Sequence, residues 1–437
     1  MKITAMNKRI LLRWSTGILL LLLTGCYKYE RLPDVQDAAY LRVFNSIPYS
    51  VDVLHAGQAP PFLCMLIDPE FDEQGIPSGG AIEGDFLATR DPFSASYSMN
   101  AGTGLDAGNG GYAGTDGRGG LTNRVTNSNP EYPGKLRVRT APSMNGFDLS
   151  AWAQVPAGKH RIVFVVRPED NTAFRQLPAL KRKRVLVDTV LELKSGEIQT
   201  LNVLTTDRDK NQYGVSLRQE QFVKRSFDPG QLYVTFYNLS GKRPFLASDS
   251  KYPDYSFFKD TIAIKYTYYI FNDNFEDLKG NIYKPLPQSN NVYLTTLYRQ
   301  TAPEQSPFLA LPFLPRDYFF DEKGMLRTFF REDKATAYRT GTMPFFAFDF
   351  VETSDASSAH GQSRVSRMNC SVSQAAINNI NLSRLPAETG ILQGQLNLFT
   401  QIGGQIRVFP TVNIFELIDN HVYMMQVQQA FEKLPRG

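Results

Sequence analysis

The 437-residue chain has few of the residue types from which metal sites and nucleophilic sites are usually built. It contains only three cysteines, four histidines and two tryptophans. No two histidines stand at the spacing of metal ligands, and the sequence has no HExxH, CxxC, GxSxG or Walker pattern. We therefore expect a non-enzymatic protein without a metal or cofactor. The histidines are His55, His160, His360 and His421.

Long apolar runs are also scarce, because the only clear one lies at the start of the chain. Four basic residues precede its core, residues 17–23, and this core is far shorter than the roughly 20 residues that span a bilayer. We interpret residues 1–25 as a signal peptide. Thr24 and Gly25 lead directly to Cys26, and Leu23-Thr24-Gly25-Cys26 resembles the lipobox of bacterial lipoproteins. That resemblance implies cleavage before Cys26 and lipidation of its thiol; the alternative is an ordinary secretory signal with an incidental cysteine.

The mature chain, which begins at Cys26 in this interpretation, has no excess of basic over acidic residues. The whole sequence has 47 basic and 43 acidic residues, but four basic and no acidic residues precede Cys26. The mature chain is therefore close to neutral. Nucleic-acid binding needs clustered excess lysine and arginine, so we expect no nucleic-acid partner.

Two cysteines, Cys64 and Cys370, remain beyond the anchor. They could form one disulfide in an oxidising envelope. We favour two buried thiols, since the cysteines fall in different predicted domains.

Short alternating apolar runs separated by small turns predict a mainly β fold of two antiparallel β-sandwich domains. Residues 371–385 are the best helix candidate. The expected strands are 39–45, 51–54, 160–166, 184–193, 198–204, 232–238, 261–270, 291–298, 345–351, 412–418 and 422–427.

Three segments carry a family resemblance: residues 39–54, Val155-Pro156-Ala157-Gly158-Lys159, and residues 190–204. They are similar to the opening strand, the "PAG" hairpin and the closing "L-x-x-G" hairpin of DUF4397-type domains. The resemblance implies an immunoglobulin-like or transthyretin-like sandwich in a bacterial envelope protein, with no catalytic residues to carry over. A long Gly/Pro-rich insertion, about 56–146, interrupts it.

The domain organisation follows from a weak internal repeat. Residues 232–238 echo residues 39–45 at an offset of 193, which predicts a second, related sandwich; convergent strand composition is the alternative. We expect a tether over 26–38, a first domain over 39–227 and a second β-rich domain over 228–437. The ending around residues 412–427 predicts a closing hairpin and resembles that of Bacteroidetes-type envelope lipoproteins.

One aromatic-rich stretch is the main candidate for ligand binding. Exposed aromatic rings can stack on sugars while nearby carboxylates and amides orient them. The alternative is a core strand followed by a turn, because alternation places half of these rings inside. The candidate residues are Tyr252, Tyr255, Tyr266, Tyr268 and Asp273.

Acidic residues suggest two weaker possibilities. Asp106 and Asp116 in the glycine-rich stretch, or residues 68–73, could hold Ca²⁺, but neither has a complete loop pattern and a solvated loop is the better interpretation. A pair of carboxylates could hydrolyse glycosides, but only their separation in space would identify it.

The expected function follows from the lipid anchor at Cys26 together with the predicted β-sandwich fold. We expect a lipoprotein held at the outer membrane through Cys26, presenting sandwich loops to a glycan or an envelope protein in a binding or adhesion role. The sequence leaves open whether it faces the surface or the periplasm. The alternatives are a structural or accessory subunit of an envelope complex and a glycosidase with a diffuse carboxylate site.

Overall fold

The computed structural model describes part of the chain, and it divides the chain into two compact units, Met1–Asp34 and Val35–Gly437. Cys26 and most of the first unit lie outside the described residues. All the described strands lie in the second unit. The described residues are 32–47, 62–90, 131–134, 136–207, 210–228, 231–240, 261–271, 283–298, 304–312, 329–332, 339–342, 345–352, 364–373, 391–402, 405–408, 411–418 and 421–428.

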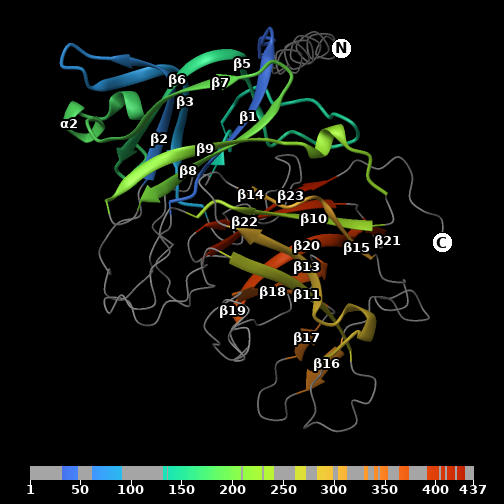
Figure 1. The fold of residues 1–437 in the computed structure, drawn as a ribbon. Coiled ribbons are helices and arrows are strands. Elements are labelled where there is room, and N and C mark those ends of the chain that lie inside the picture. Colours follow the sequence, from blue (N-terminus) through green and yellow to red (C-terminus); the bar gives the residue numbers. More distant parts are fainter. Residues whose placement is uncertain are drawn as a thin grey trace, which may run out of the picture. The chain divides into compact units, whose positions relative to one another are not determined.

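The predicted mainly β fold is confirmed (Figure 1). Within the described residues, no helix is long and apolar enough to cross a membrane.

Two sheets form the first half of the described chain. The inner sheet has the order β4-β1-β8-β9, with β5 also paired to β1, and the outer sheet has the order β3-β2-β6-β7. Apolar side chains from both sheets share one core, which includes Leu41, Met65, Phe164 and Val203. The inner strands are β1 (Ala38–Asn45), β4 (Glu131–Tyr132), β5 (Ala153–Pro156), β8 (Ile198–Asp207) and β9 (Gln212–Gln219), and the outer strands are β2 (Phe62–Phe71), β3 (Pro77–Leu87), β6 (Gly158–Arg167) and β7 (Val185–Leu193).

The second half repeats this plan with a larger outer sheet. Its inner sheet has the order β14-β10-β22-β23, with β15 also on β10, and its outer sheet has the order β12-β11-β18-β19-β20-β21, with β13 on β11. The inner strands are β10 (Gln231–Asn238), β14 (Glu304–Gln305), β15 (Leu309–Pro312), β22 (Thr411–Ile418) and β23 (His421–Gln428). The outer strands are β11 (Thr261–Phe271), β12 (Tyr283–Pro285), β13 (Val292–Tyr298), β18 (Phe345–Glu352), β19 (Arg364–Ser373), β20 (Ile391–Ile402) and β21 (Gln405–Val408); β16 (Phe329–Glu332) and β17 (Arg339–Thr342) form a separate pair.

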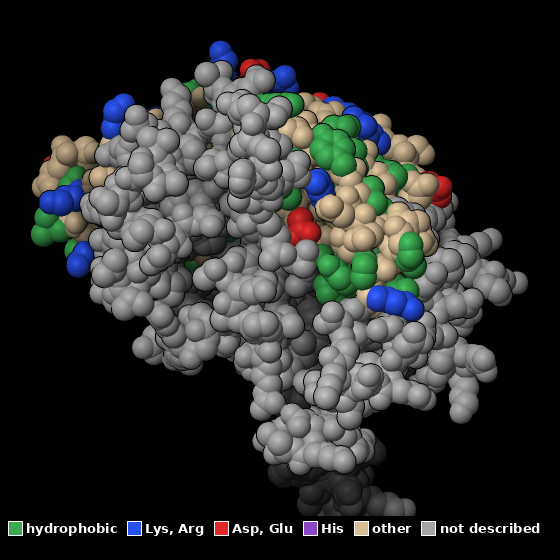
Figure 2. Space-filling model, turned by 60° about the horizontal axis from the view of Figure 1, so that its bottom comes forward, with side chains coloured by type: hydrophobic (Ala, Val, Ile, Leu, Met, Phe, Trp, Pro, Cys, Tyr) green, Lys and Arg blue, Asp and Glu red, His purple; other side chains and the backbone are tan. Residues whose placement is uncertain are grey.

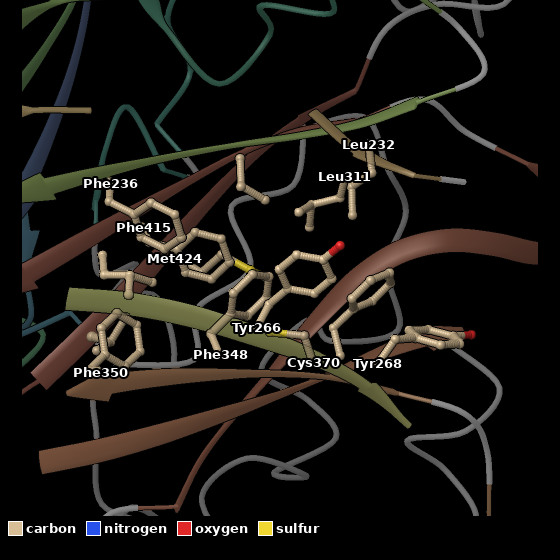
Figure 3. Packing of buried hydrophobic residues seen from close by; sticks show 14 of the residues in the cluster. Leu232, Phe236, Tyr266, Tyr268, Leu311, Phe348, Phe350, Cys370, Phe415 and Met424 are labelled. Carbon is tan, nitrogen blue, oxygen red and sulfur yellow. The ribbon is translucent and has the colours of Figure 1, made fainter. Parts of the chain in front are cut away.

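Aromatic rings fill the core of the second half (Figure 3). Phe236 on β10 stacks on Phe415 on β22, with ring centroids 5.1 Å apart, and Phe348 on β18 lies 5.0 Å from Phe415. Tyr266 and Tyr268 on β11 enter the same core. Inner and outer sheets of this half are therefore joined by ring packing, which contributes beyond the burial of area alone.

β1 and β10 occupy equivalent places in the two halves, and each pairs with its own partner strand in the same register. In each half the strand lies parallel to a later strand, with Tyr40 opposite Ile198 and Tyr233 opposite Val412. Both strands also have the same alternation of buried and half-buried residues. This agreement in register, at the predicted offset of 193, supports a common plan for the two halves.

Each inner sheet has one face on its outer sheet, and the opposite faces of the two inner sheets pack against each other. One buried cluster contains Phe44 and Leu204 from the first inner sheet and Ile414 and Met425 from the second. Consequently every residue of β22 is buried. A strand buried on both faces does not alternate between apolar inner and polar outer residues, and accordingly the polar residues Asn413 and Glu416 of β22 are buried as well.

Several sequence expectations need correction in detail. The turns at 155–159 and 195–196 are corners rather than hairpins, because β5 and β8 belong to the inner sheet while β6 and β7 belong to the outer one. Both corners are hydrogen-bonded to the start of β1: Ala157 N–H donates to Asp37 O, and Gly196 N–H donates to Ala38 O. Three pairings, β1 with β8, β10 with β22 and β19 with β20, are parallel.

The range 56–146 is not all insertion, because β2 and β3 lie inside it and form half of the outer sheet. At the far end of the chain, β19 extends through Ser373, so the start of the helix predicted over 371–385 is strand. The expected strand at 51–54 lies outside the described residues. The closing hairpin is confirmed, with Ile418 opposite His421.

The crossover between β6 and β7 covers the outer face of the first outer sheet. It includes η4 (Phe174–Gln176) and α2 (Ala179–Arg182). Phe174 and Leu177 pack on Cys64 and Val163, so this segment is only partly solvated. Cys64 and Cys370 are buried free thiols in separate cores, which confirms the favoured interpretation.

Candidate functional site

The aromatic candidates divide between the core and the undescribed part of the chain. Tyr252, Tyr255 and Asp273 lie outside the described residues. Tyr266 and Tyr268 are buried in the core of the second half, where the Tyr268 ring lies 4.4 Å from that of Phe346. Neither ring has an exposed face on which a sugar could stack. Alternation along β11 explains this, because Ile262, Ile264, Tyr266, Tyr268 and Ile270 all point inward.

Two other tyrosines, on the neighbouring strand β13, are exposed. The side chains of Tyr293 and Tyr298 are 57% and 51% exposed. They stand opposite Lys265 and Thr261 of β11, and these two residues lie on the face of β11 that points away from the core. Residues directly opposite in an antiparallel pair share a face. Tyr293 and Tyr298 therefore lie on one face, about 13 Å apart along the strand.

The surroundings of these tyrosines are polar and aromatic. The Tyr293 hydroxyl and Thr296 Oγ1 are 2.9 Å apart and form a hydrogen bond that ties the ring to the strand. On the same outer face, Tyr269 of β11 stacks on Phe345 of β18, with centroids 5.0 Å apart. We call the surface formed by Tyr293, Thr296 and Tyr298 the β13 face. It combines two exposed rings with hydroxyl groups, which suits a flat, hydroxyl-rich ligand.

Sequence alternation alone could not find the β13 face because the strand is irregular. The register between β11 and β13 shifts between Ile264 and Lys265, where one extra residue of β13 is accommodated. The six residues 293–298 of β13 thus lie opposite the five residues 261–265 of β11, so that two tyrosines an odd number of positions apart point to the same side. The useful signal was the Thr-Thr pair between the two tyrosines, which favours a half-exposed strand over a buried one.

A second constellation joins the two halves inside the protein. Glu416 on β22 accepts hydrogen bonds from Arg90 and Arg218 of the first half, and Asn202 Nδ2 donates to its Oε1 over 3.3 Å. Arg218 also pairs with Glu220, with Nη2 2.8 Å from Oε1. Nearby, Arg42 pairs with Glu131. We call these six charged residues the ionic cluster: Arg42, Arg90, Glu131, Arg218, Glu220 and Glu416.

Opposing electrostatic effects set the pKa values in the ionic cluster. Burial by itself would raise the pKa of Glu416, but the charges and hydrogen bonds of Arg218 and Arg90 outweigh it and lower the pKa to about 2. Burial also opposes the charge of Arg218, yet Glu220 and Glu416 raise its pKa. For Arg42, burial dominates and lowers the pKa. Glu416 is therefore an anion at any physiological pH.

Aromatic rings complete the lining of the ionic cluster. The guanidinium of Arg90 lies 4.0 Å from the ring centroid of Phe44, and that of Arg218 lies 4.3 Å from Tyr237. Such cation–π contacts stabilise desolvated charges. Arg42, Arg90, Glu220 and Glu416 are all at most 2% exposed. The ionic cluster holds three positive and three negative side chains, and its contacts of Arg90 and Arg218 with Glu416 join the two halves.

Residues 68–73, one of the two Ca²⁺ candidates, lie at the end of β2 and in the turn that follows it. Asp72 Oδ1 accepts hydrogen bonds from the backbone N–H groups of Gln74 and Ile76, and Gly75 has a positive φ of 73°. This is an Asx-type turn between β2 and β3. In the described part of the chain, no group of three or more His, Cys, Asp or Glu residues could hold a metal ion. Asp106 and Asp116 lie outside it.

No protein-family model matches the chain, and no curated protein does.

Proposed function

We propose that the protein is a lipid-anchored, non-enzymatic binding component of the bacterial outer membrane, and that it binds a neutral polysaccharide through the β13 face. The anchor is the lipidated thiol of Cys26. The resemblance to DUF4397-type domains and to Bacteroidetes-type envelope lipoproteins agrees with this role.

The exposure of Tyr293 and Tyr298 is the observation that carries the proposal. Only six large hydrophobic side chains are clearly exposed among the described residues, and these two are the only aromatic residues among them that are more than half exposed. Tyrosine combines an apolar ring with a polar tip, so it is enriched where proteins bind ligands. Rings about 13 Å apart on a sheet edge are held at a fixed spacing, which a polymer of repeating units can match.

Support for a binding rather than a catalytic role comes from the charged residues. The carboxylate of Glu416, whose pKa is lowered to about 2, is buried between two arginines. Its charge is used to join the halves, whereas a general acid or base must reach substrate.

Affinity electrophoresis in gels containing neutral polysaccharides tests the binding proposal. We expect at least one polymer to retard the wild-type protein. Tyr293→Ala/Tyr298→Ala should weaken this binding at least about tenfold, as expected for ring contacts at the centre of an interface. The control Phe71→Ala/Val190→Ala removes two exposed apolar side chains from the first half and should change nothing. Equal retardation of wild type and the tyrosine variant would refute the role of the β13 face.

Metabolic labelling with palmitate tests the anchor separately. Wild type and Cys64→Ala should incorporate label, because Cys64 is a buried core thiol, whereas Cys26→Ala should not. Label in Cys26→Ala equal to that in wild type would rule out lipidation of Cys26 while leaving the binding proposal untouched.

A further inference from the structure

The crossover between β6 and β7 carries an unusual combination of charge and apolar exposure. Residues 181–184 are Lys-Arg-Lys-Arg, and Leu180 before them is 74% exposed. We call residues 180–184 the basic corner. Val185, which follows it, is 39% exposed. Figure 2 shows basic and hydrophobic side chains together at the left edge, the side on which Figure 1 draws α2.

Three of the four charges in the basic corner are available at the surface. Lys181, Lys183 and Arg184 are exposed, and none of the ion pairs among the described residues includes them. Arg182 differs, because its guanidinium donates to the backbone oxygens of Leu177 and Pro77. Arg182 therefore holds the corner in place while its neighbours face solvent.

Nearby carboxylates do not neutralise these charges. Asp188 on β7 is engaged by Arg161, with contacts of 2.9 and 2.7 Å. Glu70 and Glu83 are engaged by Arg175, and Asp170 by Arg167. These four acidic side chains thus have basic partners of their own, and Lys181, Lys183 and Arg184 give the corner a net positive charge.

We propose that the basic corner docks on an anionic lipid surface. Clusters of lysine and arginine next to exposed apolar side chains are the signature of proteins that lie on charged membranes, where the cations meet phosphate headgroups and the apolar side chain enters the interface. A soluble polyanion would bind the basic side chains but would provide no apolar environment for Leu180 and Val185.

The position of the corner is compatible with a membrane contact in the anchored protein. Val166 N–H donates to Arg184 O, so the corner lies at the end of β6 and at the start of β7, whereas the start of β1 lies by the corners at 157 and 196. Nine residues of β7 separate these ends by roughly 30 Å. The thirteen residues from Cys26 to Ala38 can extend to about 40 Å, so the tether is long enough.

Vesicle sedimentation with the chain from residue 27 onward tests this docking without any lipid anchor, because that chain contains the whole compact unit Val35–Gly437. Its outcome is thus independent of lipidation at Cys26 and of the β13 face. We expect binding to vesicles of phosphatidylcholine with phosphatidylglycerol, little binding to phosphatidylcholine alone, and weaker binding at high salt.

Charge-matched variants locate the contact. Lys181→Gln/Lys183→Gln/Arg184→Gln should weaken binding on the order of 100-fold, since each basic residue near an anionic surface contributes about 1 kcal/mol. Lys159→Gln/Lys194→Gln/Lys210→Gln removes the same charge elsewhere and should have little effect. Leu180→Ser should reduce vesicle binding several-fold. Circular dichroism checks that each variant is folded.

Three results would overturn the proposal. Wild type could fail to bind anionic vesicles, or both triple variants could lose binding equally, which would indicate unspecific charge. Binding to dextran sulfate as tight as to vesicles, with no effect of Leu180→Ser, would instead identify a soluble polyanion as the partner.

Discussion

Asn202 and Glu416 occupy the same place in the two halves of the chain, and their side chains are hydrogen-bonded to each other. Asn202 pairs with Phe44 on β1, and Glu416 pairs with Tyr237 on β10, the residue equivalent to Phe44. Across the interface between the inner sheets, Asn202 Nδ2 donates to Glu416 Oε1 over 3.3 Å. Equivalent positions that meet in this way indicate an approximate two-fold relation between the halves.

A second pair follows the same relation. Arg218 stands opposite Thr200, and Met425 stands opposite Ile414, the residue equivalent to Thr200. Arg218 Nη2 lies 3.8 Å from Met425 Sδ. The two halves have thus diverged at these positions, with the arginine in the first half and the glutamate in the second. Because the ion pair needs one partner from each half, it favours this assembly over one between identical halves.

Glu416→Gln should lower the free energy of unfolding by about 3–5 kcal/mol, because it leaves the buried charges of Arg90 and Arg218 without their anion. Urea denaturation followed by tryptophan fluorescence measures this, since Trp152 is buried in the core shared by the two halves. The control is the exposed residue Glu192, where Glu192→Gln should stay within about 0.5 kcal/mol. Equal effects of the two substitutions would contradict the assigned role of Glu416.

Acid should destabilise the protein in a specific pH window. The folded pKa of Glu416, about 2, lies below its ordinary value of 4.5, so its contribution is complete above pH 4.5 and is lost as the pH falls toward 2. The difference corresponds to about 3 kcal/mol. Stability measured from pH 5 down to pH 2 should fall steeply in wild type and less steeply in Glu416→Gln; parallel curves would mean that other carboxylates control acid unfolding.

Arg218 and Glu416 should be energetically coupled. Arg218→Met introduces the residue found at the equivalent position of the second half, and Arg218→Met/Glu416→Gln should be less destabilised than the two single changes predict, by about 1–3 kcal/mol. The exposed pair Arg161 and Asp188 provides the comparison, with an expected coupling of at most about 1 kcal/mol in Arg161→Met/Asp188→Asn. Additive effects at Arg218 and Glu416 would exclude a direct interaction.

The two core thiols should be unreactive in the folded protein. Burial raises the pKa of Cys64 and of Cys370, and the thiolate is the reactive form. In the chain from residue 27 onward, Ellman's reagent should therefore titrate both thiols promptly in guanidinium chloride and neither promptly in buffer. Rapid reaction of one thiol in buffer would show that its core opens readily.

Strands in which apolar and polar residues alternate, or in which most residues are apolar, could be predicted from the sequence. The strands with which they pair could not. β1, β18 and the hairpin of β22 and β23 follow directly from local pattern and turn residues. The turn residues at 155–159 and 195–196 predict that the chain changes direction. They do not predict that it passes from one sheet to the other, because that depends on the pairing of β5 and β8 with β1, which is distant in the sequence. Parallel pairing of β1 with β8 likewise involves residues about 160 apart.

The ionic cluster was less predictable still, because its members lie far apart in the sequence. Arg90 and Glu416 are separated by 326 residues. A local sign existed, since Arg42 and Glu416 are the only charged residues in their mostly apolar strands, β1 and β22. A charge in such a strand is costly unless it is paired, so it predicts a partner without identifying it. The β13 face was missed because a bulge changes the phase of alternation.

The fold described above requires the two halves to form one body joined at the ionic cluster. Differential scanning calorimetry of the chain from residue 27 onward tests this most directly. Wild type should unfold in a single transition whose calorimetric and van't Hoff enthalpies agree, and Glu416→Gln should unfold at lower temperature with a resolved second transition. Two independent transitions in wild type, unchanged by Glu416→Gln, would show that the halves do not stabilise each other.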